Sequence, residues 1–181
     1  MLQGVVSVLD QEHCAKVEAL WSDLEREFGL KEASHAHPHL SYQVAKGYDI
    51  PRAKGVLSRV AGSATPFRIR TSGLGIFTGE NPILYVAVAR STRLAAFHSR
   101  LWERISRTAH DVHAYHYGPD NFMPHITLAA GDLTPEHLPQ VVRLLAQRPF
   151  SWEITIDNVT FVPDAAGARE QWIRFSFSQS Q

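Results

Sequence analysis

One short pattern occurs twice in this chain, and no other feature of the sequence constrains the fold as strongly. Residues 38–42 and 124–128 both read proline, histidine, aliphatic, hydroxyl, apolar. Side chains of an extended strand alternate between two faces, so His39 shares a face with Ser41, and His125 shares one with Thr127. The sequence therefore predicts two strands that each present a histidine and a hydroxyl to a shared site.

The opposite faces of these two strands are apolar. The first strand is expected to turn Leu40, Tyr42 and Val44 away from its histidine, and the second to turn away Ile126 and Leu128. Each strand can then be anchored in a hydrophobic core by one face while the other face stays available for chemistry.

The elements around the two motifs also follow the same order. Hydrophobic periodicity and turn residues predict strand, helix, motif strand, helix, strand over residues 4–77 and again over residues 83–177. We therefore expect residues 1–181 to form a single α+β domain with two pseudo-symmetric lobes. The two lobes should face one another around a central cleft that holds both motifs.

Start and stop signals set the expected boundaries. Asp10 and Gly29 should bound the first helix, and Pro51 and Pro135 suit the first turns of later helices. The helices are expected over residues 10–29, 51–62 and 94–105, and from residue 134 onward. Strands are expected over residues 4–9, 39–45, 67–70, 74–77, 83–89, 112–117, 125–130, 150–156, 159–161 and 171–177.

Composition narrows the class of protein. Eighteen Lys and Arg against eighteen Asp and Glu give a formal net charge of zero, which argues against a nonspecific nucleic-acid coat. The single cysteine excludes an intrachain disulfide framework, and the first residues lack the pattern of a signal peptide. We expect a cytoplasmic protein with no membrane span, and nothing in the sequence implies an obligatory protein partner.

Two imidazoles that face one another can divide acid and base work near neutral pH. Their ordinary pKa lies near 6.5, so one ring can accept a proton while the other donates one. In the opening of a 2',3'-cyclic phosphate, one of His39 and His125 would deprotonate water and the other would protonate the departing ribose oxygen. Ser41 and Thr127 could bond the non-bridging phosphate oxygens. This chemistry requires no metal and no cofactor.

At these residues the chain resembles the two-histidine (2H) phosphoesterase superfamily, in the branch of 2'-5' RNA ligase-like proteins. The resemblance rests on His39-Leu40-Ser41 and His125-Ile126-Thr127, and the surrounding sequence at residues 121–128, Asn-Phe-Met-Pro-His-Ile-Thr-Leu, is especially typical. Serine at position 41 replaces the commoner threonine and keeps the hydroxyl.

The resemblance carries expectations for fold, activity and ligands. It implies two antiparallel sheets with outer helices, and a 2',3'-cyclic phosphodiesterase that acts on RNA ends or cyclic nucleotides. Ligation of a 5'-hydroxyl to the cyclic phosphate, the 2'-5' RNA ligase reaction, would be the reverse of the same chemistry. The resemblance also implies that hydrolysis leaves the phosphate on the 2'-oxygen.

Two alternatives belong to other classes. His35, His37 and His39 alternate along the sequence and could ligate a catalytic metal, although Pro38 interrupts the run and no carboxylate accompanies it in a recognised ligand pattern. The fold could also hold a nucleotide or an RNA end without turnover. Intact histidine and hydroxyl residues in both motifs favour an enzyme over a binding module.

Further residues could contact the substrate. Arg68, Arg70 and Arg174 alternate along expected strands, and the forked guanidinium donors suit phosphate. Three aromatic residues precede the second motif and could stack on a base, with core packing as the alternative: Tyr115, Tyr117 and Phe122.

Overall fold

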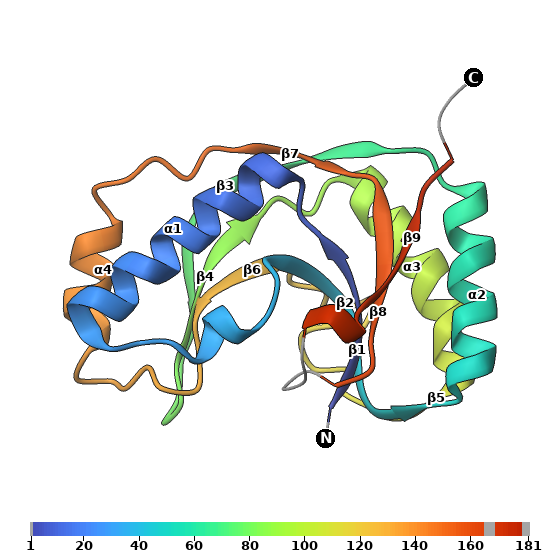
Figure 1. Ribbon diagram of the computed structural model, residues 1–181, viewed down its shortest axis with the longest axis horizontal. Helices are drawn as coiled ribbons and strands as arrows, with labels where there is room; N and C mark the ends of the chain where they lie inside the picture. Colours follow the sequence, from blue (N-terminus) through green and yellow to red (C-terminus); the bar gives the residue numbers. More distant parts are fainter. Residues whose placement is uncertain (1, 165–168, 179–181) are drawn as a thin grey trace.

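The computed structural model describes residues 2–164 and 169–178 (Figure 1). Helices and strands alternate along the chain, as the sequence predicts. Their order is β1 (Gln3–Val8), α1 (Gln11–Phe28), η1 (Glu32–His35), β2 (His39–Tyr48), α2 (Ile50–Ser63), β3 (Phe67–Phe77), β4 (Ile83–Val88), α3 (Thr92–Ile105), η2 (Ser106–Thr108), β5 (Ala109–Val112), β6 (His125–Ala129), α4 (Leu138–Leu145), β7 (Glu153–Ile156), β8 (Asn158–Val162), η3 (Arg169–Gln171) and β9 (Ile173–Ser176).

The strands form two antiparallel sheets. One has the order β5-β2-β1-β8-β9, and the other has the order β6-β4-β3-β7. Helices α2 and α3 lie on the outer side of the five-stranded sheet, and α1 and α4 lie on the outer side of the four-stranded sheet (Figure 1). Each sheet buries one apolar face under its helices. The predicted α+β architecture of two sheets with outer helices is confirmed.

Each sheet takes strands from both repeat units. β3 lies in the first unit but pairs with β4 and β7. β8 and β9 lie in the second unit, but β8 pairs with β1, and β9 pairs with β8 at the edge of the same sheet. The short turn over residues 78–82 explains the first exchange, because strands joined by a few residues pair most readily as an antiparallel hairpin. The repeat therefore describes the order of elements along the chain. It does not correspond to the two sheets, because each sheet combines strands of both units.

The helix boundaries follow the predicted caps. The Asp10 side chain accepts a hydrogen bond from the backbone N–H of His13, and Gly29 ends α1 in the left-handed conformation with φ 71°. Pro51 lies in the first turn of α2. The last helix differs, since α4 begins at Leu138 and residues 135–137 form a turn instead of a helix.

The largest differences between predicted and observed strands lie in two regions. Residues 67–70 and 74–77 belong to one strand, β3, which is continuous through a register shift between Thr71 and Leu74, where Gly73 has φ 110°. The prediction of a strand over residues 112–117 is wrong, because β5 ends at Val112 and the chain then runs as a loop to β6. Aromatic residues there raise strand propensity, but Tyr115 is solvent-exposed and pairs with no sheet.

No helix among residues 2–164 and 169–178 is long and apolar enough to cross a membrane.

Candidate active site

The two motif strands, β2 and β6, lie against one another, although they belong to different sheets. Each motif opens its strand in the same way. The backbone N–H of Leu9 donates to the carbonyl of Pro38 at 3.1 Å, and that of Val88 donates to the carbonyl of Pro124 at 3.1 Å. The matched hydrogen bonds place His39 and His125 at equivalent starts of their strands.

Both imidazole rings are held by the same kind of hydrogen bond. Nδ1 of His39 lies 2.6 Å from the carbonyl oxygen of His37, and Nδ1 of His125 lies 2.7 Å from that of Met123. A carbonyl can only accept, so Nδ1 carries the proton in each ring and Nε2 is the nitrogen that can exchange one. Within the described part of the chain, neither Nε2 has a hydrogen-bond partner.

A bulge follows the hydroxyl residue in both strands. Along β2 the partner of Val6 is Ser41 and that of Val5 is Gln43, so Tyr42 is the additional residue. Along β6 the partner of Tyr85 is Thr127 and that of Leu84 is Ala129, so Leu128 is additional. The pseudo-symmetry of the motifs therefore extends to their backbone irregularity.

The first bulge changes which side chains lie beside the motif. Val44 lines a cavity of about 70 Å³ together with His39 and Ser41. The prediction that Val44 shares a face with Leu40 and Tyr42 is therefore wrong, because the extra residue reverses the alternation beyond it.

A buried histidine stabilises this bulge. Nε2 of His98 donates to the carbonyl oxygen of Tyr42 at 3.1 Å, and the His98 ring stacks face to face on Phe122 at 3.7 Å. Burial lowers the pKa of His98 to about 4, so the ring is neutral at neutral pH. Through His98, helix α3 therefore contacts both β2 and the loop that precedes the second motif.

Burial dominates the electrostatics of the two motif histidines. His125 is only 7% exposed, and burial lowers its pKa to about 4, with the nearby His39 and His116 adding to the effect and the Met123 carbonyl opposing it. Burial also lowers the pKa of His39. Both rings are therefore neutral in the free protein at neutral pH, and a bound anion would favour protonation of one of them.

Aromatic side chains surround each motif histidine differently. The ring centroid of His39 lies 5.4 Å from that of Trp172, in an edge-to-face arrangement. The ring centroid of His125 lies 5.0 Å from that of Phe77 and 5.2 Å from that of Tyr85. Sequence reasoning missed these three aromatic residues. The alternation within predicted strands gives the periodicity of Phe77 and Tyr85, but it does not tell which face points to the other sheet.

Trp172 has one further property that bears on ligand binding. Its indole Nε1 is buried and has no hydrogen-bond acceptor among the described residues. The ring contacts His37 as well as His39, so the two histidines share one aromatic neighbour. Trp172 also lines the small cavity beside Ser41.

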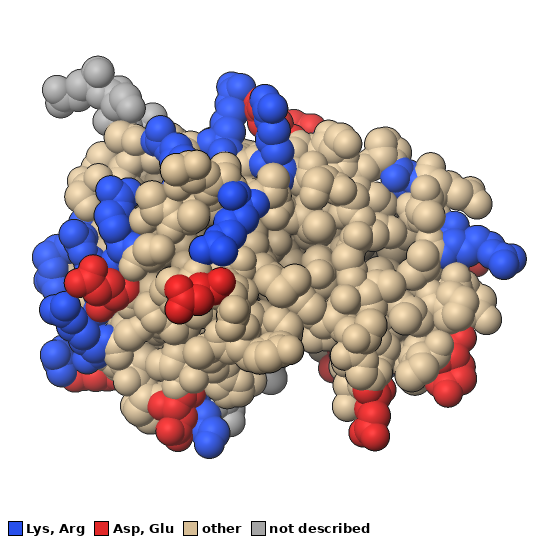
Figure 2. All heavy atoms as spheres, turned by 180° about the vertical axis from the view of Figure 1, so that it is seen from behind, with Lys and Arg blue, Asp and Glu red and all other residues tan. Residues whose placement is uncertain are grey.

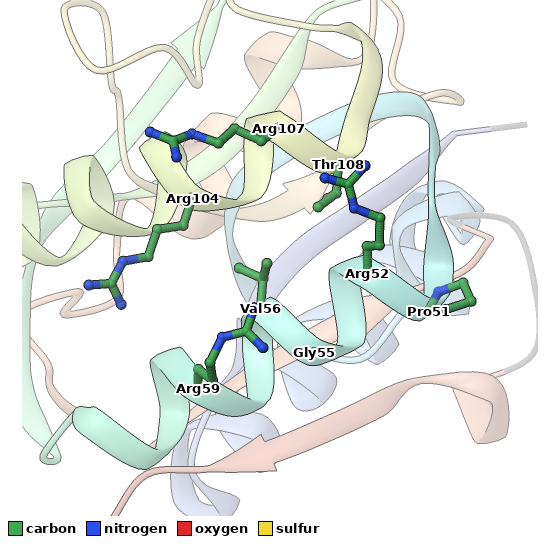
Figure 3. Close-up of a pocket in the computed structure, with 8 residues that line it drawn as sticks. All are labelled: Pro51, Arg52, Gly55, Val56, Arg59, Arg104, Arg107 and Thr108. Carbon is green, nitrogen blue, oxygen red and sulfur yellow. The ribbon is translucent and has the colours of Figure 1, made fainter.

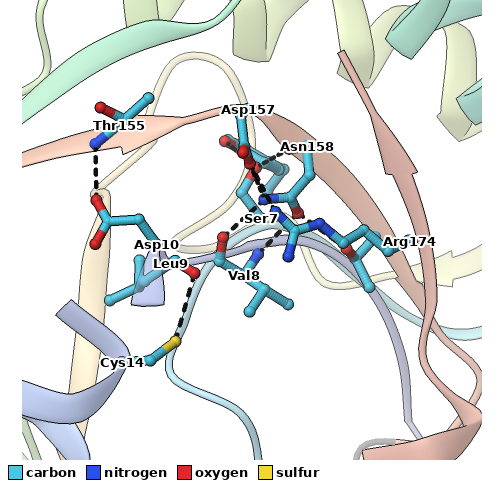
Figure 4. A network of polar contacts seen from close by, with 11 residues as sticks. Ser7, Val8, Leu9, Asp10, Cys14, Thr155, Asp157, Asn158 and Arg174 are labelled. Carbon is cyan, nitrogen blue, oxygen red and sulfur yellow. Dashed lines mark hydrogen bonds and ion pairs between the residues drawn. The ribbon is translucent and has the colours of Figure 1, made fainter. Parts of the chain in front are cut away.

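The three candidate arginines are engaged by carboxylates. Arg68 and Arg70 both pair with Glu153 across β3 and β7, at 2.5 and 3.1 Å. Arg174 pairs with Asp157 at 2.8 Å, next to Asn158, whose side chain bonds the backbone of Val8 (Figure 4). Within residues 2–164 and 169–178, none of the three bonds a motif side chain. The structure does not bring them to the two histidines.

The three candidate aromatic residues are separated by the fold. Tyr117 lies 6.1 Å from the His125 ring, whereas Tyr115 is 78% exposed. Tyr115 lines an open cavity of about 410 Å³ together with Arg90, His116 and Asn121. Phe122 is 3% exposed and packs in the core against His98, which corresponds to the packing alternative.

The histidine-rich segment forms no metal-ligand cluster with other residues of the described ranges. Among the described residues, no group of three or more His, Cys, Asp and Glu side chains is arranged to hold a metal ion. Nδ1 of His35 lies 3.7 Å from a carboxylate oxygen of Glu32, and His37 turns toward Trp172.

Comparison with known proteins identifies the family of this chain. A family model described as the 2'-5' RNA ligase superfamily matches residues 9–168. No curated protein sequence matches the chain.

Solved structures share the fold at low sequence identity. TT0787 of Thermus thermophilus is 19% identical, with a TM-score of 0.59 and 100% of each chain covered. Usb1 of Kluyveromyces marxianus is 10% identical, with a TM-score of 0.55 over 97% of this chain and 98% of its own. LigT of E. coli, complexed with ATP, is 14% identical, with a TM-score of 0.52 over 98% and 95%. At these identities the likeness concerns the fold.

Proposed function

Because this chain belongs to the 2'-5' RNA ligase superfamily, whose members include two-histidine phosphoesterases, we propose that it hydrolyses a 2',3'-cyclic phosphate on an RNA end or nucleotide. The observation that carries the proposal is the matched pair of imidazoles. His39 and His125 each fix Nδ1 on a backbone carbonyl and leave Nε2 free for proton transfer. The solved complexes of LigT with ATP and of Usb1 with uridine monophosphate support a nucleotide as the ligand class.

The proposed reaction divides two proton transfers between the two rings. The neutral histidine takes a proton from water as the water oxygen attacks phosphorus. The bond from phosphorus to one ribose oxygen breaks, and the protonated histidine donates its proton to that oxygen. When a 5'-hydroxyl attacks the cyclic phosphate in place of water, the same ring opening forms a 2'-5' phosphodiester, which is the 2'-5' RNA ligase reaction and the reverse of cleavage of that linkage.

The phosphate itself completes the site. Ser41 and Thr127 are half-buried beside the histidines, and each hydroxyl can donate to a non-bridging oxygen whose charge grows in the transition state. The negative phosphate also offsets the effect of burial on the imidazoles. Binding of substrate thus raises the pKa of the adjacent rings and prepares one of them as the acid.

The pH dependence of turnover should report this coupling. Active free enzyme needs one protonated and one neutral imidazole, and burial lowers the pKa of both His39 and His125 below the ordinary 6.5. We expect kcat/KM to follow a bell with its maximum below pH 6.5, falling at higher pH as the acid loses its proton. The profile of kcat should lie at higher pH, because bound phosphate stabilises the imidazolium. A kcat/KM maximum above pH 6.5 would contradict this electrostatic account.

A product assay tests the proposed reaction. Purified protein is incubated with 2',3'-cyclic AMP, and separately with RNA ending in a cyclic phosphate and RNA ending in a 5'-hydroxyl, with and without EDTA. We expect hydrolysis to a single regioisomer, the 2'-phosphate, at unchanged rate in EDTA. Chromatography resolves the isomers, and gel electrophoresis detects joined RNA.

Each other outcome of that assay identifies a different reaction. Loss of activity in EDTA with recovery on addition of one metal would establish a metal-dependent hydrolase. Binding of the cyclic nucleotide without product would establish a binding module. A mixture of 2'- and 3'-phosphates would show that the acid is not held against one leaving oxygen.

A further inference from the structure

A groove runs between α2 and α3 on the outer side of the five-stranded sheet. It encloses about 800 Å³ and is lined by residues of α2, α3 and η2 (Figure 3). The motif face of β2 lies on the other side of that sheet, because Tyr42 turns away from His39 and packs its ring at 5.4 Å from Phe97 of α3. The groove is therefore separate from the site that holds the two histidines.

Four arginines dominate this groove. Arg52 and Arg59 come from α2, Arg104 from α3 and Arg107 from η2, and all four line the opening. Their guanidinium groups surround it (Figure 3). Seen from behind, Lys and Arg side chains gather at the side of the molecule where α2 and α3 lie (Figure 2). The concentration is local, since the chain as a whole has a formal net charge of zero.

The carboxylates that the structure describes neutralise these four arginines only in part. Arg107 pairs with Glu103 at 3.3 Å, and Arg52 lies 3.9 Å from Asp49. Arg59 and Arg104 have no ion pair with any residue in the described part of the chain, and no acidic residue among those described lines the groove. Like charges that converge without counter-charges repel one another, so an anion in the groove would be stabilised.

The shape and lining of the groove indicate what kind of anion fits. Guanidinium forks match phosphate oxygens, and Arg52 and Arg59 stand seven residues apart on one helix, about 10 Å along its axis. Several linked phosphate groups can meet guanidinium groups that are distributed over this length. No aromatic side chain of the described residues lines the groove, so it offers no stacking platform for a base.

We propose that the groove between α2 and α3 is a second ligand site that binds a run of linked phosphate groups without reading bases. The backbone of an RNA strand and a free oligophosphate both supply this chemistry. Binding there does not depend on the proposed reaction, because the groove lies on the far side of the sheet from His39 and Ser41.

Binding measurements on the full chain test the site. The probes are a short single-stranded 2'-O-methyl RNA without terminal phosphates, which resists turnover, and inorganic triphosphate. The test variant carries Arg59→Gln and Arg104→Gln, and the matched control carries Arg26→Gln and Arg143→Gln, two arginines of α1 and α4 that lie away from the groove. Fluorescence anisotropy and calorimetry give the affinities over a range of salt concentrations.

We expect the test variant to lose about 10-fold or more in affinity, with the control unchanged and the salt slope for the RNA reduced by about 1.4, as for two lost phosphate contacts. A loss of affinity for the RNA alone identifies a strand backbone as the ligand. A loss of affinity for triphosphate as well shows that free oligophosphates are also ligands of the groove. Equal affinities of test and control variants would overturn the proposal. Hydrolysis of a cyclic mononucleotide should be unchanged in the test variant, and its loss would overturn the separation of the two sites.

Discussion

Replacement of either motif histidine by alanine is expected to lower kcat/KM for a 2',3'-cyclic nucleotide by about 100-fold or more, the range of general acid–base catalysis. His39→Ala removes one proton-transfer group and His125→Ala removes the other, and neither ring can serve as acid and base in the same step. A loss of this size corresponds to about 2.7 kcal/mol of transition-state stabilisation. Initial rates over a range of substrate concentrations give the values.

A second pair of variants isolates the reactive nitrogen. His39→Asn and His125→Asn keep an N–H close to the position of Nδ1, which can still bond the carbonyl of His37 or Met123, but they lack Nε2. We expect the same loss as with alanine. His35→Ala, in the same histidine-rich segment, serves as the control and should keep full activity. Near-normal turnover in a folded asparagine variant would remove that histidine from the mechanism.

The two hydroxyl residues should carry the next largest effect. Ser41→Ala and Thr127→Val are each expected to lower kcat/KM by about 10- to 100-fold, somewhat less than the loss of a preorganised oxyanion donor elsewhere. The reason is that each change removes one donor to a non-bridging phosphate oxygen while it leaves both imidazoles in place. Single and double variants measured together would show whether the two donors act on the same transition state.

Exchange of the two hydroxyl types supplies the matched control. Ser41→Thr and Thr127→Ser keep the donor and alter only one methyl group, and the two motifs have equivalent backbone geometry through the bulge. These variants should retain most of the activity. If Ser41→Ala and Thr127→Val were as active as the exchange variants, the hydroxyls would have no part in binding the phosphate.

The pKa shifts of the motif histidines could not be predicted from the sequence pattern. The sequence gives only the ordinary pKa of an imidazole, near 6.5, as a starting value, whereas the structure buries both rings and lowers both pKa values. The shift comes from exclusion of water by neighbours that are distant in sequence, such as Phe77 and Tyr85 around His125. The proposed enzyme is therefore one whose acid becomes protonated in response to its anionic substrate.

The arginines also show that sequence patterns do not determine which charged side chains come together in the fold. Alternation of Arg68 and Arg70 along a strand suggests a phosphate-binding face, but β7 brings Glu153 between them. The arginines that do converge without carboxylates among the described residues, Arg59 and Arg104, belong to two helices and share no sequence pattern. Charge clusters of this kind arise from the packing of elements against one another.

What the sequence determines here is local. A strand alternates its side chains wherever it lies, so the repeated pattern alone places His39 with Ser41 and His125 with Thr127, and caps such as Asp10 and Gly29 fix the helix ends. The tertiary structure alone decides that β3, β8 and β9 join sheets with strands of the other repeat unit. It also decides that the bulge in β2 turns Val44 toward the motif and that Trp172 lies against His39. These features depend on strand pairing and burial between segments far apart in the chain, and the free energies that select them belong to contacts no short stretch of sequence contains.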